Sequence, residues 1–170
     1  SADAQGGDGT EQATEQTELA IEKLRGDDEA PEVQVVPAAV GEAIGEGPVT
    51  LAATPDGRAI GLLANGGVHV SRDGGASFRR CKVAGHAIAL AFAGQGEGAR
   101  LLTLVAPEDR SRGGDLSLQE VGESGSSRVA DLPGAGAASG RAALVWDATR
   151  EVLWVASSSG LVAYEPAARH

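Results

Sequence analysis

The chain has 170 residues, of which 42% are hydrophobic, only 3% are aromatic and 25 are glycine. This length suits a single domain whose core is built from Val, Leu, Ile and Ala, and the scattered glycines exclude a helical bundle. No stretch approaches the roughly 20 consecutive apolar residues that span a bilayer, so we expect no membrane insertion.

The net charge of −10 is concentrated near the N-terminus. Residues 1–46 hold twelve carboxylates against Lys23 and Arg25, whereas the following 124 residues hold twelve acidic and twelve basic side chains. A neutral body offers no basic surface, so we expect no nucleic-acid partner. The chain lacks Met, from which we expect that Ser1 follows processing or cutting of a longer chain, and its one cysteine, Cys81, leaves the compartment open.

Residues 1–32 are predicted to form an acidic tail that contains one short helix. Residues 1–9 are small, polar and glycine-rich, which is typical of disorder, whereas residues from about 10 to 25 are rich in helix formers. Like-charged pairs such as Glu18 and Glu22 lie four residues apart and weaken an isolated helix. Two interpretations stay open, namely a solvated spacer and a docking helix for a partner.

Residues 33–170 are predicted to form an all-β, β-propeller-like domain, because short apolar runs alternate there with turn residues every 8 to 12 positions. The expected strands are Val33–Val36, Val49–Thr54, Ala59–Ala64, Val68–Ser71, Phe78–Val83, Ala87–Ala93, Arg100–Val105, Leu116–Val121, Arg128–Leu132, Ala142–Asp147, Val152–Ala156 and Leu161–Tyr164. Pro55-Asp56-Gly57 and Asn65-Gly66-Gly67 predict tight turns between neighbouring strands, and therefore antiparallel hairpins.

These strands group into about three similar units of four antiparallel strands, which resemble the blades of a propeller. The units begin near Val49, Ala87 and Ala142, and the third reaches His170 before a fourth strand. We expect Val33–Val36 to fill that vacancy, because pairing an N-terminal strand with the last blade would remove an exposed edge.

One specific motif lies between the third and fourth strands of the first unit. Residues Ser71-Arg72-Asp73-Gly74-Gly75-Ala76-Ser77-Phe78 match the pattern Ser-x-Asp-x-Gly-x-Ser/Thr followed by Trp or Phe. The motif resembles the Asp-box (BNR repeat) of bacterial sialidases, sortilin-type receptors and photosystem assembly factors. The resemblance implies a β-propeller in which the box is a folding device away from the ligand face. Its structural residues would be Ser71, Asp73, Gly75, Ser77 and Phe78, with Asp73 accepting hydrogen bonds from turn amides and Gly75 adopting a conformation closed to other residues.

We predict no catalytic, cofactor-binding or metal-binding residues. Tyr164-Glu165 is the one pair that could be compared with a sialidase nucleophile and its acidic partner, but alternation favours packing for Tyr164. The three histidines, His69, His86 and His170, and the lone Cys81 share no metal-ligand spacing. The tripeptide Arg25-Gly26-Asp27 is explained by chance, and the basic run Arg79-Arg80-Cys81-Lys82 by a solvated strand face.

The resemblance implies a non-catalytic binding or assembly module that presents its loops to a protein or glycan partner. From the same resemblance we expect a location outside the cytoplasm, either periplasmic or secreted. Two alternatives are a fragment or subunit of a sialidase-like glycoside hydrolase and a structural accessory domain of a larger protein. Three blades do not close a ring that needs at least four. A homodimer could complete a six-bladed ring, or the chain could be part of a longer propeller or a small open sandwich.

Overall fold

A computed structural model of the chain describes residues 47–108, 115–132, 142–157 and 160–166, together with the backbone of two short strands nearer the N-terminus. The described residues form strands and one short 3-10 helix, η1 (Gly96–Gly98). The strands are β1 (Ala20–Lys23), β2 (Glu32–Val35), β3 (Val49–Ala53), β4 (Ile60–Ala64), β5 (Gly67–Ser71), β6 (Arg79–Cys81), β7 (His86–Ala93), β8 (Arg100–Ala106), β9 (Leu116–Val121), β10 (Ser126–Leu132), β11 (Ala143–Asp147), β12 (Val152–Ser157) and β13 (Gly160–Tyr164). No helix in these ranges is long and apolar enough to cross a membrane.

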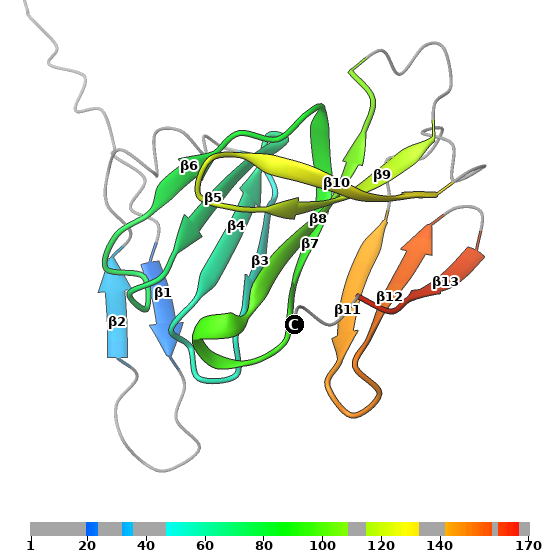
Figure 1. The fold of residues 1–170 in the computed structure, drawn as a ribbon. Coiled ribbons are helices and arrows are strands. Elements are labelled where there is room, and N and C mark those ends of the chain that lie inside the picture. The colour runs from blue at the N-terminus through cyan, green and yellow to red at the C-terminus, as the bar shows by residue number, and fades with distance from the viewer. Residues whose placement is uncertain are drawn as a thin grey trace, which may run out of the picture.

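The prediction of an all-β protein is confirmed, and the strands form three main antiparallel sheets (Figure 1). Sheet I has the order β3-β4-β5-β6, sheet II has the order β7-β8-β9-β10, and sheet III has the order β11-β12-β13. Within each sheet, strands that are consecutive in the sequence pair with each other. The connections inside a sheet are too short for the crossover that parallel strands require, so each forms a hairpin. The three sheets therefore follow the three units expected from the sequence.

Two predicted turns fix the register of sheet I. Ala64 pairs with Gly67, which leaves Asn65 and Gly66 as a two-residue loop with φ values of 49° and 74°. Positive φ at both positions is the requirement of the hairpin turn that matches strand twist. In the preceding turn, the Thr54 hydroxyl donates to Asp56 Oδ1 at 2.6 Å and accepts from the Ala59 amide at 3.0 Å. The hydrogen bond from the Thr54 hydroxyl is the main reason why the pKa of Asp56 lies below its usual value.

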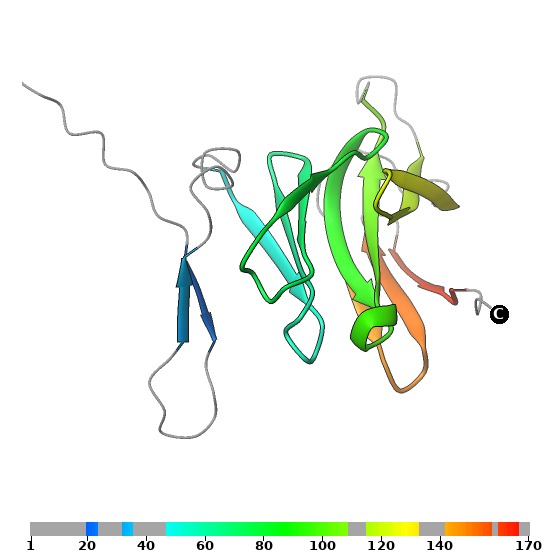
Figure 2. The same cartoon turned by 60° about the vertical axis from the view of Figure 1, so that its left-hand side comes forward.

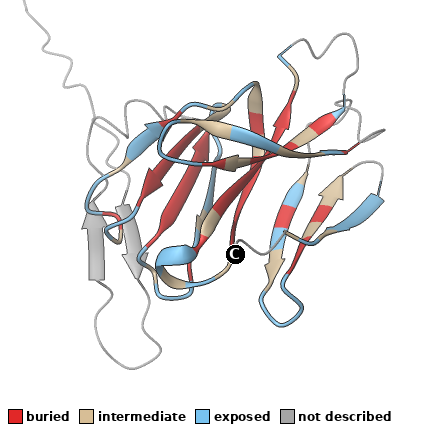
Figure 3. Cartoon of the chain, in the orientation of Figure 1, coloured by how far each residue is buried: buried red, intermediate tan, exposed pale blue. Residues whose placement is uncertain are grey.

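Sheet II lies between the other two sheets, and both of its faces are covered (Figure 2). Residues of β7 alternate between the two cores: Leu90 and Phe92 pack toward sheet I, whereas Ala89, Ala91 and Ala93 pack toward sheet III. Figure 3 shows the resulting run of buried residues along β7 and β8. Burial on both sides explains why this segment of the sequence is almost continuously apolar.

A bulge interrupts β7 between Ala87 and Ala89, where the register with β8 shifts. The buried Thr103 hydroxyl donates to the Ala89 carbonyl at 2.9 Å beside this irregularity. A buried hydroxyl needs a hydrogen-bond partner, and the Ala89 carbonyl beside the bulge accepts from Thr103. This hydrogen bond explains how the apolar strand β8 accommodates a polar residue.

Sheets I and II approach closely where Gly61 of β4 faces sheet II. A Cβ at this position would lie 3.3 Å from Leu101 Cδ1 and 3.4 Å from Leu90 Cδ1. Leu101 is fully buried and Leu90 is 4% exposed, so neither side chain is free to move into solvent. Gly61 thus allows the leucines of sheet II to fill the space above β4.

The structure differs from the two predictions made for the N-terminal segment, the short helix and the closing strand. Ala20–Lys23 forms strand β1 where a helix was expected, and the remainder of the predicted helix and tail lies outside the described residues. The expected closing strand forms at Glu32–Val35, but it pairs with β1 and not with sheet III. The register places Ala20 opposite Val35 and Lys23 opposite Glu32. A helix would instead place the like-charged Glu18 and Glu22 one turn apart, which weakens it.

Candidate functional site

The loop between β5 and β6 is organised by the side chains of the motif at residues 71–78. The Ser71 hydroxyl donates to Asp73 Oδ1 at 2.7 Å and accepts the Gly75 amide at 2.7 Å. Asp73 also accepts the Ser77 amide at 2.9 Å and the Ser77 hydroxyl at 2.5 Å. The turn is thus held by polar bonds among its own residues, with Asp73 as acceptor.

Two consecutive glycines give this loop its shape, with φ values of 72° at Gly74 and 100° at Gly75. The Gly74 amide donates to the Arg58 carbonyl at 2.8 Å, which joins this turn to the turn between β3 and β4. The hydrogen bonds from Ser77 and Ser71 lower the pKa of Asp73 from 3.8 to about 2. Asp73 therefore carries its negative charge at every physiological pH. Phe78, the last residue of the motif, is half-buried.

Beside this turn, a cleft of about 490 Å³ opens between sheets I and II. Its walls come from the turns at one end of both sheets and from the strands that leave them. The lining residues that carry charge are Arg58, Arg72, Arg79, Glu97, Arg100, Glu120 and Glu123. The cleft thus collects side chains that lie up to 65 positions apart in the sequence, since it runs from Arg58 to Glu123.

Three arginines of sheet I each reach a different part of sheet II. Arg72 Nη1 donates to the Ala99 carbonyl at 3.1 Å, and Arg79 Nη1 donates to the Glu123 carbonyl at 2.9 Å. Arg58 lies 3.7 Å from Glu97 in an exposed ion pair. A guanidinium has five N–H donors, so one bond to a carbonyl leaves others for a ligand. These arginines both bridge the two sheets and set positive charge along the cleft.

The fourth arginine at the cleft behaves differently. Arg100 lies 3.6 Å from Glu120, and both side chains are mostly buried, at 25% and 13% exposure. Register places Arg100 opposite Ala93 and Glu120 opposite Leu102, and these partners belong to the core between sheets II and III. The pair therefore neutralises itself on the other face of sheet II. In the cleft, Glu97 pairs with Arg58 and Glu123 adds a second carboxylate, so Arg72 and Arg79 supply the positive charge that is left.

Cys81 also lines the cleft, at the end of β6. Its side chain is buried among the apolar residues between sheets I and II, and burial raises the pKa of its thiol. A thiol of raised pKa is a poor nucleophile at neutral pH. Cys81 is thus a packing residue of the cleft wall.

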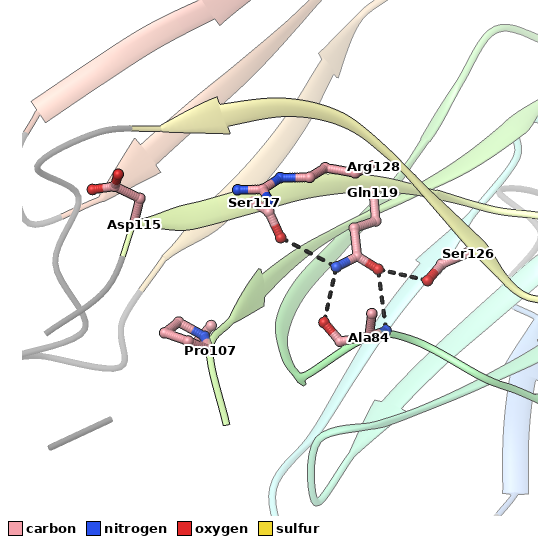
Figure 4. Close-up of a pocket in the computed structure, with 8 residues that line it drawn as sticks. Ala84, Pro107, Asp115, Ser117, Gln119, Ser126 and Arg128 are labelled. Atoms are coloured by element: carbon pink, nitrogen blue, oxygen red, sulfur yellow. Dashed lines mark hydrogen bonds between the residues drawn. The ribbon is translucent and has the colours of Figure 1, made fainter. Parts of the chain in front are cut away.

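A smaller pocket of about 250 Å³ lies at the connection between sheets I and II, around Gln119 (Figure 4). The Gln119 amide nitrogen donates to the Ala84 carbonyl at 3.0 Å and to the Ser117 hydroxyl at 3.1 Å. Its amide oxygen accepts the Ala84 amide at 3.2 Å and the Ser126 hydroxyl at 2.5 Å. All four hydrogen-bonding positions of the buried side chain are used, so Gln119 fastens the β6–β7 connection to sheet II.

The remaining candidate residues from the sequence do not meet at one place. Tyr164 is partly buried against the core between sheets II and III, and Glu165 after it is exposed. His69 is buried in sheet I, where burial and then the charge of Arg80 lower its pKa, and His86 begins β7. Within the part of the chain that the structure describes, no three His, Cys, Asp or Glu side chains form a group that could hold a metal ion.

Arg25-Gly26-Asp27 and His170 lie outside the described residues. In the basic run that follows residues 71–78, Arg79 and Arg80 are both exposed, and of these two arginines only Arg79 lines the cleft. The sequence contained a signal for the cleft, because Arg58, Arg72 and Arg79 each follow or occupy a turn at the same end of sheet I. A comparison of the chain with protein-family models, with curated proteins and with solved structures finds no match.

Proposed function

We propose that the protein is a non-catalytic binding module of the Asp-box β-propeller type, and that the cleft between sheets I and II takes an anionic group of a protein or glycan partner. Support for the propeller comes from three antiparallel sheets in sequential strand order and from an Asp-box loop between the third and fourth strands of sheet I. First strands also lie beside one another, β3 against β7 and β7 against β11. This is the arrangement of strands that surround a propeller axis.

The observation that carries the binding proposal is the convergence of Arg58, Arg72 and Arg79 on one cleft. Its volume of about 490 Å³ falls in the range of small-molecule and side-group sites, which is about 300–1,000 Å³. Guanidinium groups match carboxylate and sulfate oxygens in geometry as well as charge. An acidic sugar or an acidic side chain is therefore the chemistry that the cleft suits.

The test is an NMR titration of the full chain with two probes, a sulfated disaccharide and a short glutamate-rich peptide. We expect amide shifts at the cleft with at least one probe, and a loss of that binding in Arg58→Gln/Arg79→Gln. The matched control is Arg128→Gln/Arg150→Gln, which also removes two positive charges, from ion pairs with Asp131 and Asp147 outside the cleft. Equal binding by the double variant and the wild type would contradict a role for the cleft.

The non-catalytic part of the proposal has its own test. Chromogenic sialosides and other aryl glycosides should not be hydrolysed by the purified chain. Hydrolysis that disappears in Tyr164→Phe would instead favour the sialidase-like alternative. Packing of Tyr164 against the core supports the non-catalytic assignment, because a nucleophile must reach its substrate.

A further inference from the structure

The pocket around Gln119 is a second concave site, and its residues are separate from those of the cleft. It is lined by Ala84, Ala106, Pro107, Asp115, Ser117, Gln119, Ser126 and Arg128, none of which lines the cleft. Its volume of about 250 Å³ lies just below the usual range of ligand pockets, about 300–1,000 Å³, so it suits a small molecule. Figure 4 shows polar side chains at β9 and β10 on one side of the pocket, with Pro107 and Ala84 across from them.

The polar residues of the pocket share one face of sheet II. Asp115, Ser117 and Gln119 alternate along the chain, so their side chains point to the same side of β9. Register places Arg128 of β10 opposite Gln119, and Ser126 lies two positions before Arg128. Residues that are opposite each other in a sheet, or two apart in one strand, lie on the same face. The five side chains therefore form one continuous polar group.

The backbone of Ala84 fixes which end of the Gln119 amide faces each serine. A backbone N–H only donates and a carbonyl only accepts, so Oε1 of Gln119 must face the Ala84 amide and Nε2 must face the Ala84 carbonyl. Nε2 then donates to the Ser117 hydroxyl, and Oε1 accepts from the Ser126 hydroxyl. Ser117 thus keeps its own proton to donate, whereas Ser126 has donated its proton and keeps its lone pairs.

Two charged side chains complete the pocket. Arg128 contacts Asp131 through Nε and Nη2, and because a guanidinium has five N–H donors, others remain for a ligand. Asp131 itself does not line the pocket. Asp115 supplies a carboxylate, which has about four lone-pair sites and so accepts several donors at once. The walls that the structure describes therefore carry one positive and one negative side chain.

The spacing of these two charges matches a small zwitterion. Asp131, which pairs with the Arg128 guanidinium, is opposite Ser117 in the register, so the guanidinium lies near Ser117. Figure 4 shows the Arg128 side chain following the same course along β9. Asp115 precedes Ser117 by two residues, which is about 7 Å along a strand. A molecule whose ammonium and carboxylate share one carbon spans that distance with one hydrogen bond of about 2.8 Å at each end.

We propose that the pocket binds a free α-amino acid with a small apolar side chain, whose carboxylate lies between Arg128 and the Ser117 hydroxyl and whose ammonium lies at Asp115. A carboxylate alone would bring a second negative charge to Asp115, and an amine alone would bring a second positive charge to Arg128. Ala106 and Pro107 supply an apolar wall for the side chain of the ligand. The inference rests on this pocket and does not require that the cleft bind a ligand.

The first measurement is an NMR titration of the full chain with L-alanine and with L-valine. We expect amide shifts in β9 and β10 with at least one of them, with a dissociation constant of about 1 mM or below. N-acetyl-L-valine and L-valine amide each lack one of the two charges, and each should bind at least about 10-fold more weakly than L-valine. The absence of shifts with both amino acids would overturn the proposal. Equal binding of either derivative would overturn the assignment of a zwitterion.

The second measurement tests the two charged residues. Arg128→Gln and Asp115→Asn should each raise the dissociation constant by about 10-fold or more. Both side chains are exposed, so circular dichroism should show unchanged folding. The control is Arg150→Gln, because Arg150 also pairs with an aspartate three residues away but does not line the pocket. Wild-type affinity in both pocket variants would overturn the proposal.

The same variants separate this pocket from the cleft. Arg128→Gln should weaken the amino acid at the pocket and leave the shifts that the sulfated disaccharide causes at the cleft. Arg58→Gln/Arg79→Gln should have the opposite effect, because these two arginines line only the cleft. Loss of amino-acid binding in the cleft variant, with Arg128→Gln unaffected, would move the amino-acid site to the cleft and overturn the proposal.

Discussion

Arg72 and Ala99 join the turn at residues 71–78 to sheet II through the hydrogen bond from Arg72 Nη1 to the Ala99 carbonyl at 3.1 Å. The same guanidinium lies 5.7 Å from the centre of the Phe92 ring, so a single side chain contacts sheet II in two ways. The turn is thereby part of the contact between two sheets and not only a local connection.

Replacement of Arg72 should weaken that contact. We expect Arg72→Ala to lower the free energy of unfolding by about 1–2 kcal/mol, from the lost hydrogen bond and the lost cation–π contact. Arg72→Lys should lose less, because it keeps the charge near Phe92. Urea denaturation measures both. A loss in Arg72→Ala no greater than that in Arg150→Ala, which removes an exposed arginine, would show that the bridge does not stabilise the fold.

Asp73 should make stability depend on pH in acid. Its pKa is lowered to about 2 in the folded protein from 3.8, so its contribution is present above 3.8 and is lost as the pH falls toward 2. Asp73 is exposed, and solvent screening limits the loss in Asp73→Ala to about 1 kcal/mol near neutral pH. The comparison is urea denaturation of the two proteins at about pH 6 and about pH 2, where the difference should shrink. A difference that stays constant would mean that the Asp73 charge is not what holds the turn.

Two glycines form a matched pair for separating backbone strain from a side-chain clash. Gly66 and Gly57 have φ values of 74° and 67°, so Ala is strained at both. A Cβ at Gly66 would lie 2.2 Å from His86 Nδ1, whereas nothing lies within 4 Å of a Cβ at Gly57. We expect losses of about 2 kcal/mol for Gly66→Ala and about 1 kcal/mol for Gly57→Ala in thermal or urea unfolding. Equal losses would mean that His86 moves aside without cost.

Gln119 should be the most costly polar residue to replace. Gln119→Ala leaves both backbone groups of Ala84 without their side-chain partner and opens a cavity, so we expect a loss of about 2–3 kcal/mol. Gln119→Glu keeps the shape but replaces the donor to the Ala84 carbonyl with an acceptor. Its stability should therefore recover partly in acid, where the new carboxyl is protonated. A Gln119→Glu protein as stable as wild type at neutral pH would argue against this hydrogen-bond network.

Much of the fold follows from local sequence. The apolar runs at β7 and β8 and the Asn65-Gly66 turn predict strands and a hairpin without knowledge of tertiary structure, because period and turn chemistry are local properties. The hydrogen bonds within the turn at residues 71–78 are local as well, since Ser71 and Ser77 lie six positions apart. Strands whose two faces are both buried, such as β7 and β8, are therefore well predicted from the sequence.

The cleft and the bulge could not be predicted in the same way. The carbonyl that Arg79 reaches lies on Glu123, 44 positions further along the chain, and nothing in the local pattern indicates which turn of sheet II it meets. The sequence shows Thr103 only as a polar residue in an apolar strand. Its hydrogen bond to the Ala89 carbonyl, beside the bulge, becomes evident only in the structure. The β1 segment is predicted to be a helix because its composition favours helix, and composition does not show that Lys23 lies opposite Glu32 in a hairpin.

The alanines of β7 that face sheet III, Ala89, Ala91 and Ala93, set a limit on how the sequence of this protein can vary. They are 4%, 6% and 1% exposed, so a larger side chain at any of them would have to push two sheets apart. Alanine is often replaced without loss of stability in other proteins, but at these three positions we expect larger side chains to be poorly tolerated. The smallest residues of the sheet are the ones that determine its spacing, and sequence drift should be confined to the turns and outer strands around them.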